Sequence, residues 1–185
     1  TLNDMAADTV AVMDVLDINN AHIVGASMGG MIAPVVAARY TQRTRSLVSI
    51  MSTTGSPQLP PPSAEASESL LGVTTDDGAA AERREAMVAR GFYPQSMGRQ
   101  MMAVFKTGDR SDAVATITAP TLVVHGAKDT LLPPPHGAHT AQLIGDSELV
   151  VYDSMGHNIP DEVLPKLLQK MTLHMQAADT AAMTP

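Results

Sequence analysis

The sequence predicts an α/β protein built on a mainly parallel sheet of about four strands, flanked by helices. Short apolar runs of strand length alternate with longer segments whose apolar residues recur at helical spacing, and this alternation is typical of a parallel sheet covered on both faces. A proline-rich segment after Thr53 then opens a block of helical stretches, residues 55–119, that interrupts the alternation. An insertion of this kind over the mouth of a sheet commonly forms a lid.

Four elements fill the first third of the chain. They come in the order helix, strand, helix, strand, at residues 2–18, 21–26, 29–40 and 45–53. We expect Asn3 to cap the first helix, because an asparagine side chain can accept a hydrogen bond from an N–H group of the first turn. Pro34 falls well inside the second helix, where its missing N–H should kink or loosen a turn.

The remaining elements complete one domain in three parts. The insertion predicts helices at 63–72, 78–92 and 96–108. The rhythm of strand and helix then resumes at 119–129, 136–145, 147–158 and 160–176, and the tail at 177–185 looks frayed. The parts are a core segment that contains the first strand, a helical lid and a second core segment, at residues 1–54, 55–119 and 120–185.

Composition indicates a folded protein of one domain. The 185 residues are 44% hydrophobic and 17% charged, which is far from the composition of a disordered chain. The net charge of −7 argues against a nucleic-acid partner, because no basic stripe is present to neutralise phosphates. The lack of cysteine excludes disulfides and thiolate metal sites, and we expect no metal and no cofactor.

The sequence also gives an expectation about membranes and location. No apolar stretch is long enough to span a membrane, and no basic and then apolar leader stands at the start. We therefore expect a cytoplasmic protein without a membrane span. The chain begins with Thr1 rather than with methionine, which leaves a removed signal sequence open.

Residues 25–29 carry the pattern G-x-S-x-G around Ser27, between a predicted strand and a predicted helix. Small residues beside such a serine let strand and helix approach each other, so that a sharp turn lifts the hydroxyl above the sheet. The pattern is common, and an ordinary glycine turn is the alternative. The flanking strand and helix favour a nucleophile.

A serine nucleophile needs a histidine base that a carboxylate orients. Of the six histidines, His157 is preferred because it follows the last predicted strand, where a loop returns a side chain to the top of the sheet. His125 ends a strand, and a buried structural role suits it better. The others are placed less well, namely His22 at the wrong end of its strand, His136 and His139 at a helix start, and His174 in the terminal helix.

Asp129 is the preferred acid, because it follows a strand at the carboxyl edge of the sheet, where the loops of a parallel sheet converge. Asp153 is the closest rival, and the weaker candidates are Asp109, Asp112 and Asp161. For any one aspartate, a solvated loop residue is the alternative. We expect His157 within hydrogen-bond reach of Ser27 with Asp129 behind it, while Asp153 and His125 point elsewhere.

The segments "VGASMGG", "APTLVVHGAKDTLLPP" and "DSMGHNIP" together resemble the α/β-hydrolase superfamily over nearly the whole chain. Within it, the chain looks most like lidded serine esterases of the aclacinomycin methylesterase type. The resemblance implies Ser27 as nucleophile, Asp129 as acid and His157 as base. It also implies that the backbone N–H of Met28 is one of two oxyanion donors.

The resemblance has one large departure, which lies at the start of the chain. Members of the superfamily normally have four strands and a helix before the helix expected at 2–18, and that segment supplies the second oxyanion donor. The resemblance therefore implies missing strands, a missing oxyanion loop and weakened activity. The strand at 21–26 would become an open apolar edge, and we expect the chain to cover it by forming a twofold dimer.

The expected function is hydrolysis of a small apolar carboxylic ester through an acyl-enzyme. Methionines of the lid would line an adaptable acyl pocket, or would pack in a helical core, and they include Met87, Met97, Met101 and Met102. Two other functions stay open. One is a weak or catalytically silent hydrolase remnant that acts through self-association, and the other is a hydrolase of thioesters, lactones or carbon–carbon bonds.

Overall fold

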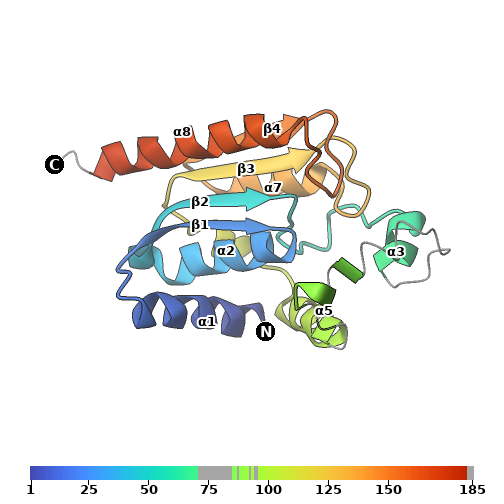
Figure 1. Ribbon diagram of the computed structural model, residues 1–185, viewed down its shortest axis with the longest axis horizontal. Coiled ribbons are helices and arrows are strands. Elements are labelled where there is room, and N and C mark those ends of the chain that lie inside the picture. The colour runs from blue at the N-terminus through green and yellow to red at the C-terminus, as the bar shows by residue number, and fades with distance from the viewer. Residues whose placement is uncertain (71–84, 87, 92, 94–95, 183–185) are drawn as a thin grey trace.

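The computed structural model describes residues 1–70, 85–86, 88–91, 93 and 96–182. These residues form one parallel sheet with its strands in sequence order, β1-β2-β3-β4 (Figure 1). Each strand overlaps a segment predicted as strand, and the bounds are β1 (Ala21–Ala26), β2 (Thr44–Ile50), β3 (Thr121–Gly126) and β4 (Ser147–Tyr152). The predicted class, an α/β protein with a parallel sheet of about four strands, is confirmed.

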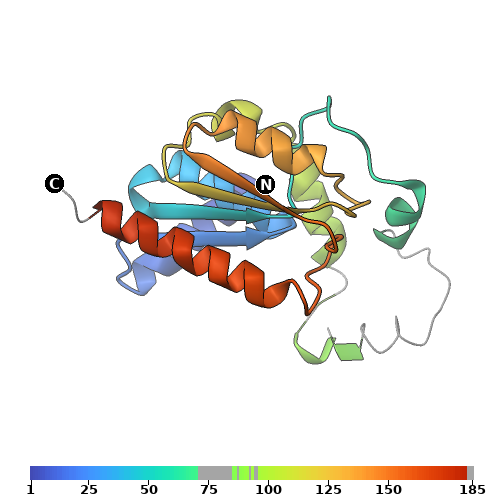
Figure 2. The ribbon, with the colours of Figure 1, turned by 90° about the horizontal axis from the view of Figure 1, so that it is seen from above.

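Helices cover both faces of this sheet. Helices α2 (Met28–Arg39) and α7 (Pro135–Leu143) pack on one face, and α8 (Leu164–Ala182) lies across the other (Figure 2). Helix α1 (Leu2–Val15) packs beside α2, and a short 3-10 turn, η1 (Thr41–Arg43), leads into β2.

Alternate residues of the strands face the two helical layers. On one face, Ile23 and Leu47 are buried in a cluster with α2 side chains such as Val36. On the other face, Val48 is buried in a second cluster with Leu167 of α8. Because helices cover both faces, the central strands must be apolar on both sides rather than alternate with polar residues.

Two expectations about helix ends are wrong. Helix α1 is capped by Thr1 rather than Asn3: the Thr1 hydroxyl accepts from the Asp4 N–H at 3.3 Å, and the Asp4 carboxylate accepts from the Thr1 backbone amine. The cap lies earlier because Leu2 is already helical and fully buried. The tail is not frayed from residue 177, because α8 continues to Ala182.

Pro34 lies inside α2, which continues through it to Arg39. A proline has no N–H to donate, so the carbonyl four residues earlier, that of Gly30, lacks its helical partner. The hydroxyl of Ser49, on β2, donates to this carbonyl at 3.2 Å. A side chain of the sheet thus replaces the hydrogen bond that the proline removes.

The insertion includes α3 (Ala64–Leu70), α5 (Ser96–Thr107) and α6 (Ser111–Val114). Helices α3 and α5 lie beyond the carboxyl ends of the strands (Figure 1). Most of the helix predicted at 78–92 lies outside the described residues, and Met87 lies outside them too. Met97 and Met102 are exposed on α5, and Met101 is half-buried there.

The two ends of the insertion are held together at its base. The guanidinium of Arg110 is buried and donates to the carbonyls of Thr53, at 2.8 Å, and Gly108, at 2.5 Å. Burial lowers the pKa of Arg110 to about 10, so it remains charged at neutral pH. One buried cation therefore joins the segment that leaves the sheet to the segment that returns.

Two observations on the described residues limit what else the fold contains. Among the helices that the structure describes, none combines the length and the apolar character needed to cross a membrane. Within the same part of the chain, no group of three or more histidine, aspartate or glutamate side chains is placed to hold a metal ion.

Candidate active site

Ser27 occupies a sharp turn between β1 and α2. Its φ of 53° lies in the left-handed region, which a residue with a side chain adopts only when its surroundings impose it. Two glycines permit the turn. A side chain at Gly25 would collide with the backbone of Gly29, and a Cβ at Gly30 would lie 2.6 Å from the Cβ of Ser52.

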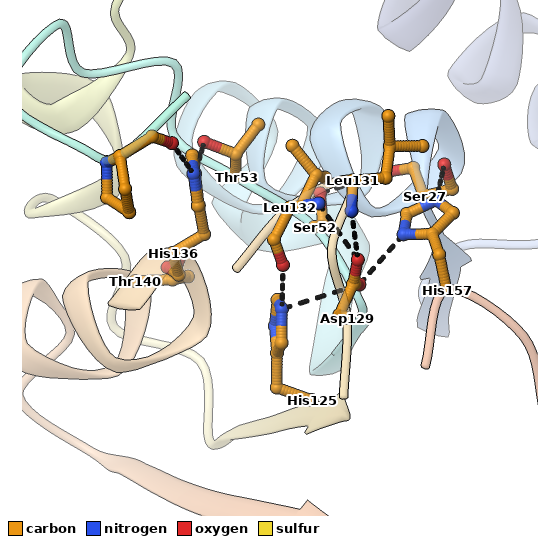
Figure 3. A network of polar contacts seen from close by, with 11 residues as sticks. Ser27, Ser52, Thr53, His125, Asp129, Leu131, Leu132, His136, Thr140 and His157 are labelled. Carbon is orange, nitrogen blue, oxygen red and sulfur yellow. Dashed lines mark hydrogen bonds and ion pairs between the residues drawn. The ribbon is translucent and has the colours of Figure 1, made fainter. Parts of the chain in front are cut away.

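The hydroxyl of Ser27 is hydrogen-bonded to His157, and His157 is hydrogen-bonded to Asp129 (Figure 3). Ser27 Oγ lies 2.8 Å from His157 Nε2, and His157 Nδ1 lies 2.8 Å from Asp129 Oδ2. Since a carboxylate accepts hydrogen bonds, Nδ1 carries the ring proton and Nε2 is free to accept from the serine. The three side chains lie together as the sequence predicts, although they come from three separate loops.

The carboxylate of Asp129 is fully buried and surrounded by donors. Its Oδ1 accepts from the N–H groups of Leu131, at 3.0 Å, and Leu132, at 2.8 Å, while Oδ2 accepts from His157. Burial raises the pKa of this carboxyl, but the hydrogen bonds from His157 and Leu132 outweigh it, so the pKa lies below its ordinary value. Asp129 is therefore ionised at neutral pH and holds His157 in one orientation.

His125 lies closer to this group than expected. It is fully buried at the end of β3, where its Nε2 donates to the carbonyl of Leu132 at 2.7 Å and lies 3.6 Å from Asp129 Oδ2. The expectation that it points elsewhere is wrong, because the loop after β3 turns back over the strand end and brings Leu132 onto the ring. The rival acid, Asp153, is exposed.

Two other histidines, His136 and His139, contact the start of the insertion. His136 Nδ1 lies 2.6 Å from the Thr53 hydroxyl, and His139 Nδ1 lies 3.1 Å from that of Thr54, so α7 holds the start of the insertion. Burial lowers the pKa of His136. His22 is the second residue of β1, at the opposite end of that strand from Ser27.

Two backbone features complete the surroundings of Ser27. Met28 is the first residue of α2, and N–H groups at a helix N-terminus point outward and favour negative charge. The hydroxyl of Ser52, which the sequence analysis did not single out, donates to the carbonyl of Ser27 at 3.0 Å. The pairing of β1 with β2 could have indicated it, because Ala26 lies opposite Ile50 in that register.

The fold and this geometry define the class of protein. A family model described as the alpha/beta hydrolase fold matches residues 1–76, and the chain has the fold of the α/β-hydrolase superfamily. The sequence resemblance to that superfamily is confirmed.

Relatives with known names include esterases and other hydrolases. The chain is 26% identical to rhodomycin D methylesterase DnrP from Streptomyces peucetius, over 95% of the chain and 74% of that protein. It is 30% identical to a 2-hydroxy-6-oxononadienedioate/2-hydroxy-6-oxononatrienedioate hydrolase from Cupriavidus pinatubonensis, over 79% of the chain and 58% of that protein. Among solved structures, the meta-cleavage product hydrolase CumD from Pseudomonas fluorescens aligns with a TM-score of 0.73 and 21% identity, covering 96% of the chain and 72% of its own.

Proposed function

We propose that the chain hydrolyses carboxylic esters through a covalent acyl-enzyme, with Ser27 as nucleophile, His157 as general base and Asp129 as the acid that orients it. The observation that carries the proposal is the continuous hydrogen-bond chain from Ser27 Oγ through His157 to Asp129, with both distances at 2.8 Å. A bare serine hydroxyl is a poor nucleophile, and this arrangement supplies what it lacks.

The reaction follows from the positions of the protons. As Ser27 Oγ attacks the ester carbonyl, its proton passes to His157 Nε2, and the buried Asp129 carboxylate stabilises the imidazolium that forms. His157 then gives the proton to the leaving alcohol, which leaves an acyl-serine. Water repeats the sequence, with His157 again as base, and releases the carboxylic acid.

The tetrahedral intermediate carries a negative oxygen that needs hydrogen-bond donors. We assign the backbone N–H of Met28 as one donor, because it follows Ser27 directly at the N-terminus of α2. Loss of one of two oxyanion donors slows turnover by about 10²- to 10³-fold. If Met28 is the sole donor, the chain is therefore a slow esterase rather than an inactive protein.

We propose an ester with a small apolar acyl group as the substrate. The rhodomycin D methylesterase named above acts on an ester. The described part of the insertion offers methionines on α5, Met97 and Met102, which are exposed. Flexible, polarisable methionine side chains adapt to apolar groups of different shape.

A second candidate is the hydrolysis of a carbon–carbon bond with the same three residues. The relative at 30% identity is a hydrolase of 2-hydroxy-6-oxo dienedioates. An ester and such a substrate differ in the leaving group, which is an alcohol in one case and a carbon atom in the other. Assaying both substrate classes with the same preparation therefore distinguishes the two candidates.

The outer edge of β1 supports a proposal about assembly. The described residues place no strand beside that edge, and Val24 on β1 is 44% exposed. Large apolar side chains of α1 and the turn after it are also exposed nearby in the chain, namely Val12, Val15, Leu16 and Ile18. Since an uncovered edge with apolar neighbours favours association, we propose that two copies of the chain pair there.

The experiment that tests the function is hydrolysis of p-nitrophenyl esters of increasing acyl length, with the Ser27→Ala variant as control. Wild-type protein should release p-nitrophenol faster than Ser27→Ala, and a serine-directed phosphonate should label Ser27. If wild type and Ser27→Ala behave alike on all esters and on the dienedioate, and no label attaches, the silent hydrolase remnant is the correct description.

A further inference from the structure

Ser52 holds the carbonyl of the proposed nucleophile. It lies just after β2 and is buried, with 4% of the residue's surface exposed. Its hydroxyl donates to Ser27 O at 3.0 Å, and the same carbonyl accepts the helical hydrogen bond of the Met31 N–H at 3.1 Å. A buried hydroxyl with a partner of this kind fixes the direction of that carbonyl.

The same end of β2 also holds the other backbone group of Ser27. The Ser27 N–H donates to the carbonyl of Ile50 at 2.9 Å. Between Ile50 and Ser52 lies Met51, whose φ of 41° is left-handed and whose N–H bonds to Val124 O at 2.8 Å. Residues 50 and 52 thus hold the two backbone polar groups of Ser27 from either side of a strained turn.

Because a peptide unit is planar, the direction of the Ser27 carbonyl also determines the direction of the next N–H group. The Ser27 carbonyl and the Met28 N–H belong to one planar unit, and the structure contains no cis peptide among the described residues. In a trans peptide the C=O and N–H point in opposite directions. Fixing the direction of the Ser27 carbonyl therefore fixes the direction of the Met28 N–H.

Gly30 makes this contact possible. Ser52 lies so close to the first turn of α2 that a Cβ at Gly30 would approach its Cβ to 2.6 Å and its Oγ to 3.0 Å. Ser27 itself has φ 53° and ψ −118°, a conformation that persists only where neighbouring groups determine it. Rotation about ψ of Ser27 would swing the peptide that carries the Met28 N–H.

We propose that Ser52 is a positioning residue of the esterase reaction: its hydroxyl fixes the Ser27–Met28 peptide so that the Met28 N–H points at the oxyanion. This inference rests on the proposed function. Ser52 touches neither substrate nor the reacting oxygen, and it acts through the peptide. An oxyanion donor must be aimed before the reaction, because its value lies in needing no reorganisation as charge develops.

Ser49 provides a matched control. It lies on β2, the strand that precedes Ser52, and is also buried, and its hydroxyl donates to a carbonyl of α2, that of Gly30, at 3.2 Å. Gly30 O belongs to the peptide that carries the Met31 N–H, which is three residues beyond the proposed oxyanion donor. Ser49→Ala therefore removes a similar hydrogen bond but leaves in place both groups that donate to the Ser27 carbonyl, the Ser52 hydroxyl and the Met31 N–H.

The test compares Ser52→Ala, Ser49→Ala and Ser27→Ala with wild type on one p-nitrophenyl ester. For Ser52→Ala, we expect kcat to fall about tenfold with KM within about twofold, which is less than the loss of a whole oxyanion donor. The rate of phosphonate labelling at Ser27 should fall in parallel. The midpoint of the pH profile should not move, because Ser52 contacts neither His157 nor Asp129. Ser49→Ala should keep kcat within about twofold of wild type.

The outcomes separate the two proposals. If Ser27→Ala is as active as wild type, the proposed function is wrong, and this inference falls with it. If Ser27→Ala is inactive while Ser52→Ala and Ser49→Ala have equal kcat, only the inference about Ser52 is wrong. If Ser52→Ala does not fold, the kcat values of Ser52→Cys and Ser49→Cys give the same comparison. Cysteine keeps an atom at the γ position, which alanine lacks, and its thiol is only a weak donor.

Discussion

Among the described residues, two sets of serine, histidine and aspartate side chains lie in contact, near opposite ends of β1. The set of Ser27, His157 and Asp129 lies where β1 ends. At the start of strand β1, the Nδ1 of His22 lies 2.8 Å from Ser46 Oγ, and its Nε2 lies 3.2 Å from Asp179 Oδ1. By residue types and distances alone, the second set would pass for a catalytic one.

The differences between the two sets lie in their surroundings. Ser46 is fully buried within strand β2, so no substrate carbonyl can approach its hydroxyl. Ser27 is partly exposed on a sharp turn at the N-terminus of a helix. Asp129 is fully buried, whereas the side chain of Asp179 is 44% exposed and also binds Arg45 at 2.9 Å. A hydrogen-bonded triad therefore indicates a site only where loops at the carboxyl edge leave room for a ligand.

The largest expected difference between the sets is in the two serines. Ser27→Ala should lower kcat/KM for a p-nitrophenyl ester by about 10⁴-fold, or to the rate without enzyme, because it removes the nucleophile. Ser46→Ala should leave kcat/KM within about twofold, since it loses only one buried hydrogen bond. Initial rates of both variants, measured on protein of equal thermal stability, make the comparison. Equal losses in the two variants would contradict the assignment of roles.

The two carboxylates provide the next comparison. Asp129→Asn should lower kcat by about 10³-fold, because an amide cannot hold His157 with Nε2 free or stabilise its cation. Asp179→Asn should leave kcat within about twofold, since Asp179 lies at the other end of β1. Single-turnover rates at saturating substrate test this. A large loss in Asp179→Asn would show that the second set affects the reaction.

The members of the first set could be predicted from the sequence because each of them follows a strand. Ser27, Asp129 and His157 each stand just after a short apolar run, and parallel strands bring such positions to one edge. The turn at Ser27 could also be predicted from the sequence, since Gly25 and Gly29 flank it. Nothing comparable marks the second set, because His22 and Ser46 lie within strands and Asp179 lies in the segment that was expected to fray.

The contacts that refine the first set were not predictable for the same reason. Ser52 reaches Ser27 only because β1 pairs with β2 in a particular register. His125 approaches Asp129 only because the loop between them folds back to present the Leu132 carbonyl. The replacement of the missing Pro34 hydrogen bond by Ser49 likewise depends on how α2 lies across β2. Periodicity along one segment does not contain these distances between segments.

Strand β1 contains His22 of the second set and precedes Ser27 of the first set. Its outer edge leads to a third prediction. We expect wild-type protein at micromolar concentration to sediment with about twice the mass of one chain, through pairing at β1. Val24→Lys should yield monomers, because a charged side chain on an edge strand opposes pairing. Val151→Lys, on the other edge strand β4, is the matched control, since Val151 is 43% exposed against 44% for Val24.

Analytical ultracentrifugation of the three proteins separates the possible results. A monomeric wild type would contradict the assembly proposal, and a dimer that Val151→Lys dissociates would move the interface to β4. If the dimer forms through β1, the esterase rate of Val24→Lys also tells whether the site around Ser27 works within one chain.

The smallest expected effect concerns how the two carboxylates stabilise the fold. Burial raises the pKa of Asp129, but hydrogen bonds from His157 and Leu132 lower it by more, so the pKa lies below its ordinary value. A hydrogen bond from Arg45 lowers the pKa of Asp179. A carboxyl whose folded-state pKa is depressed stabilises the fold above its ordinary pKa of 3.8, and this contribution is lost as the pH falls through the folded-state value.

The difference in burial gives the two variants different salt responses. At pH 7, Asp129→Asn should lower the free energy of unfolding by about 1.5–3 kcal/mol, the range for hydrogen bonds to a charged group, and the loss should shrink below pH 4. Because Asp129 is buried, 1 M NaCl should change that loss little, whereas salt should abolish the smaller effect of Asp179→Asn, which is exposed. Urea unfolding at pH 3 and pH 7, with and without salt, measures both. An Asp129→Asn loss that stays constant from pH 7 to pH 3 would mean that its carboxylate does not stabilise the fold through its charge.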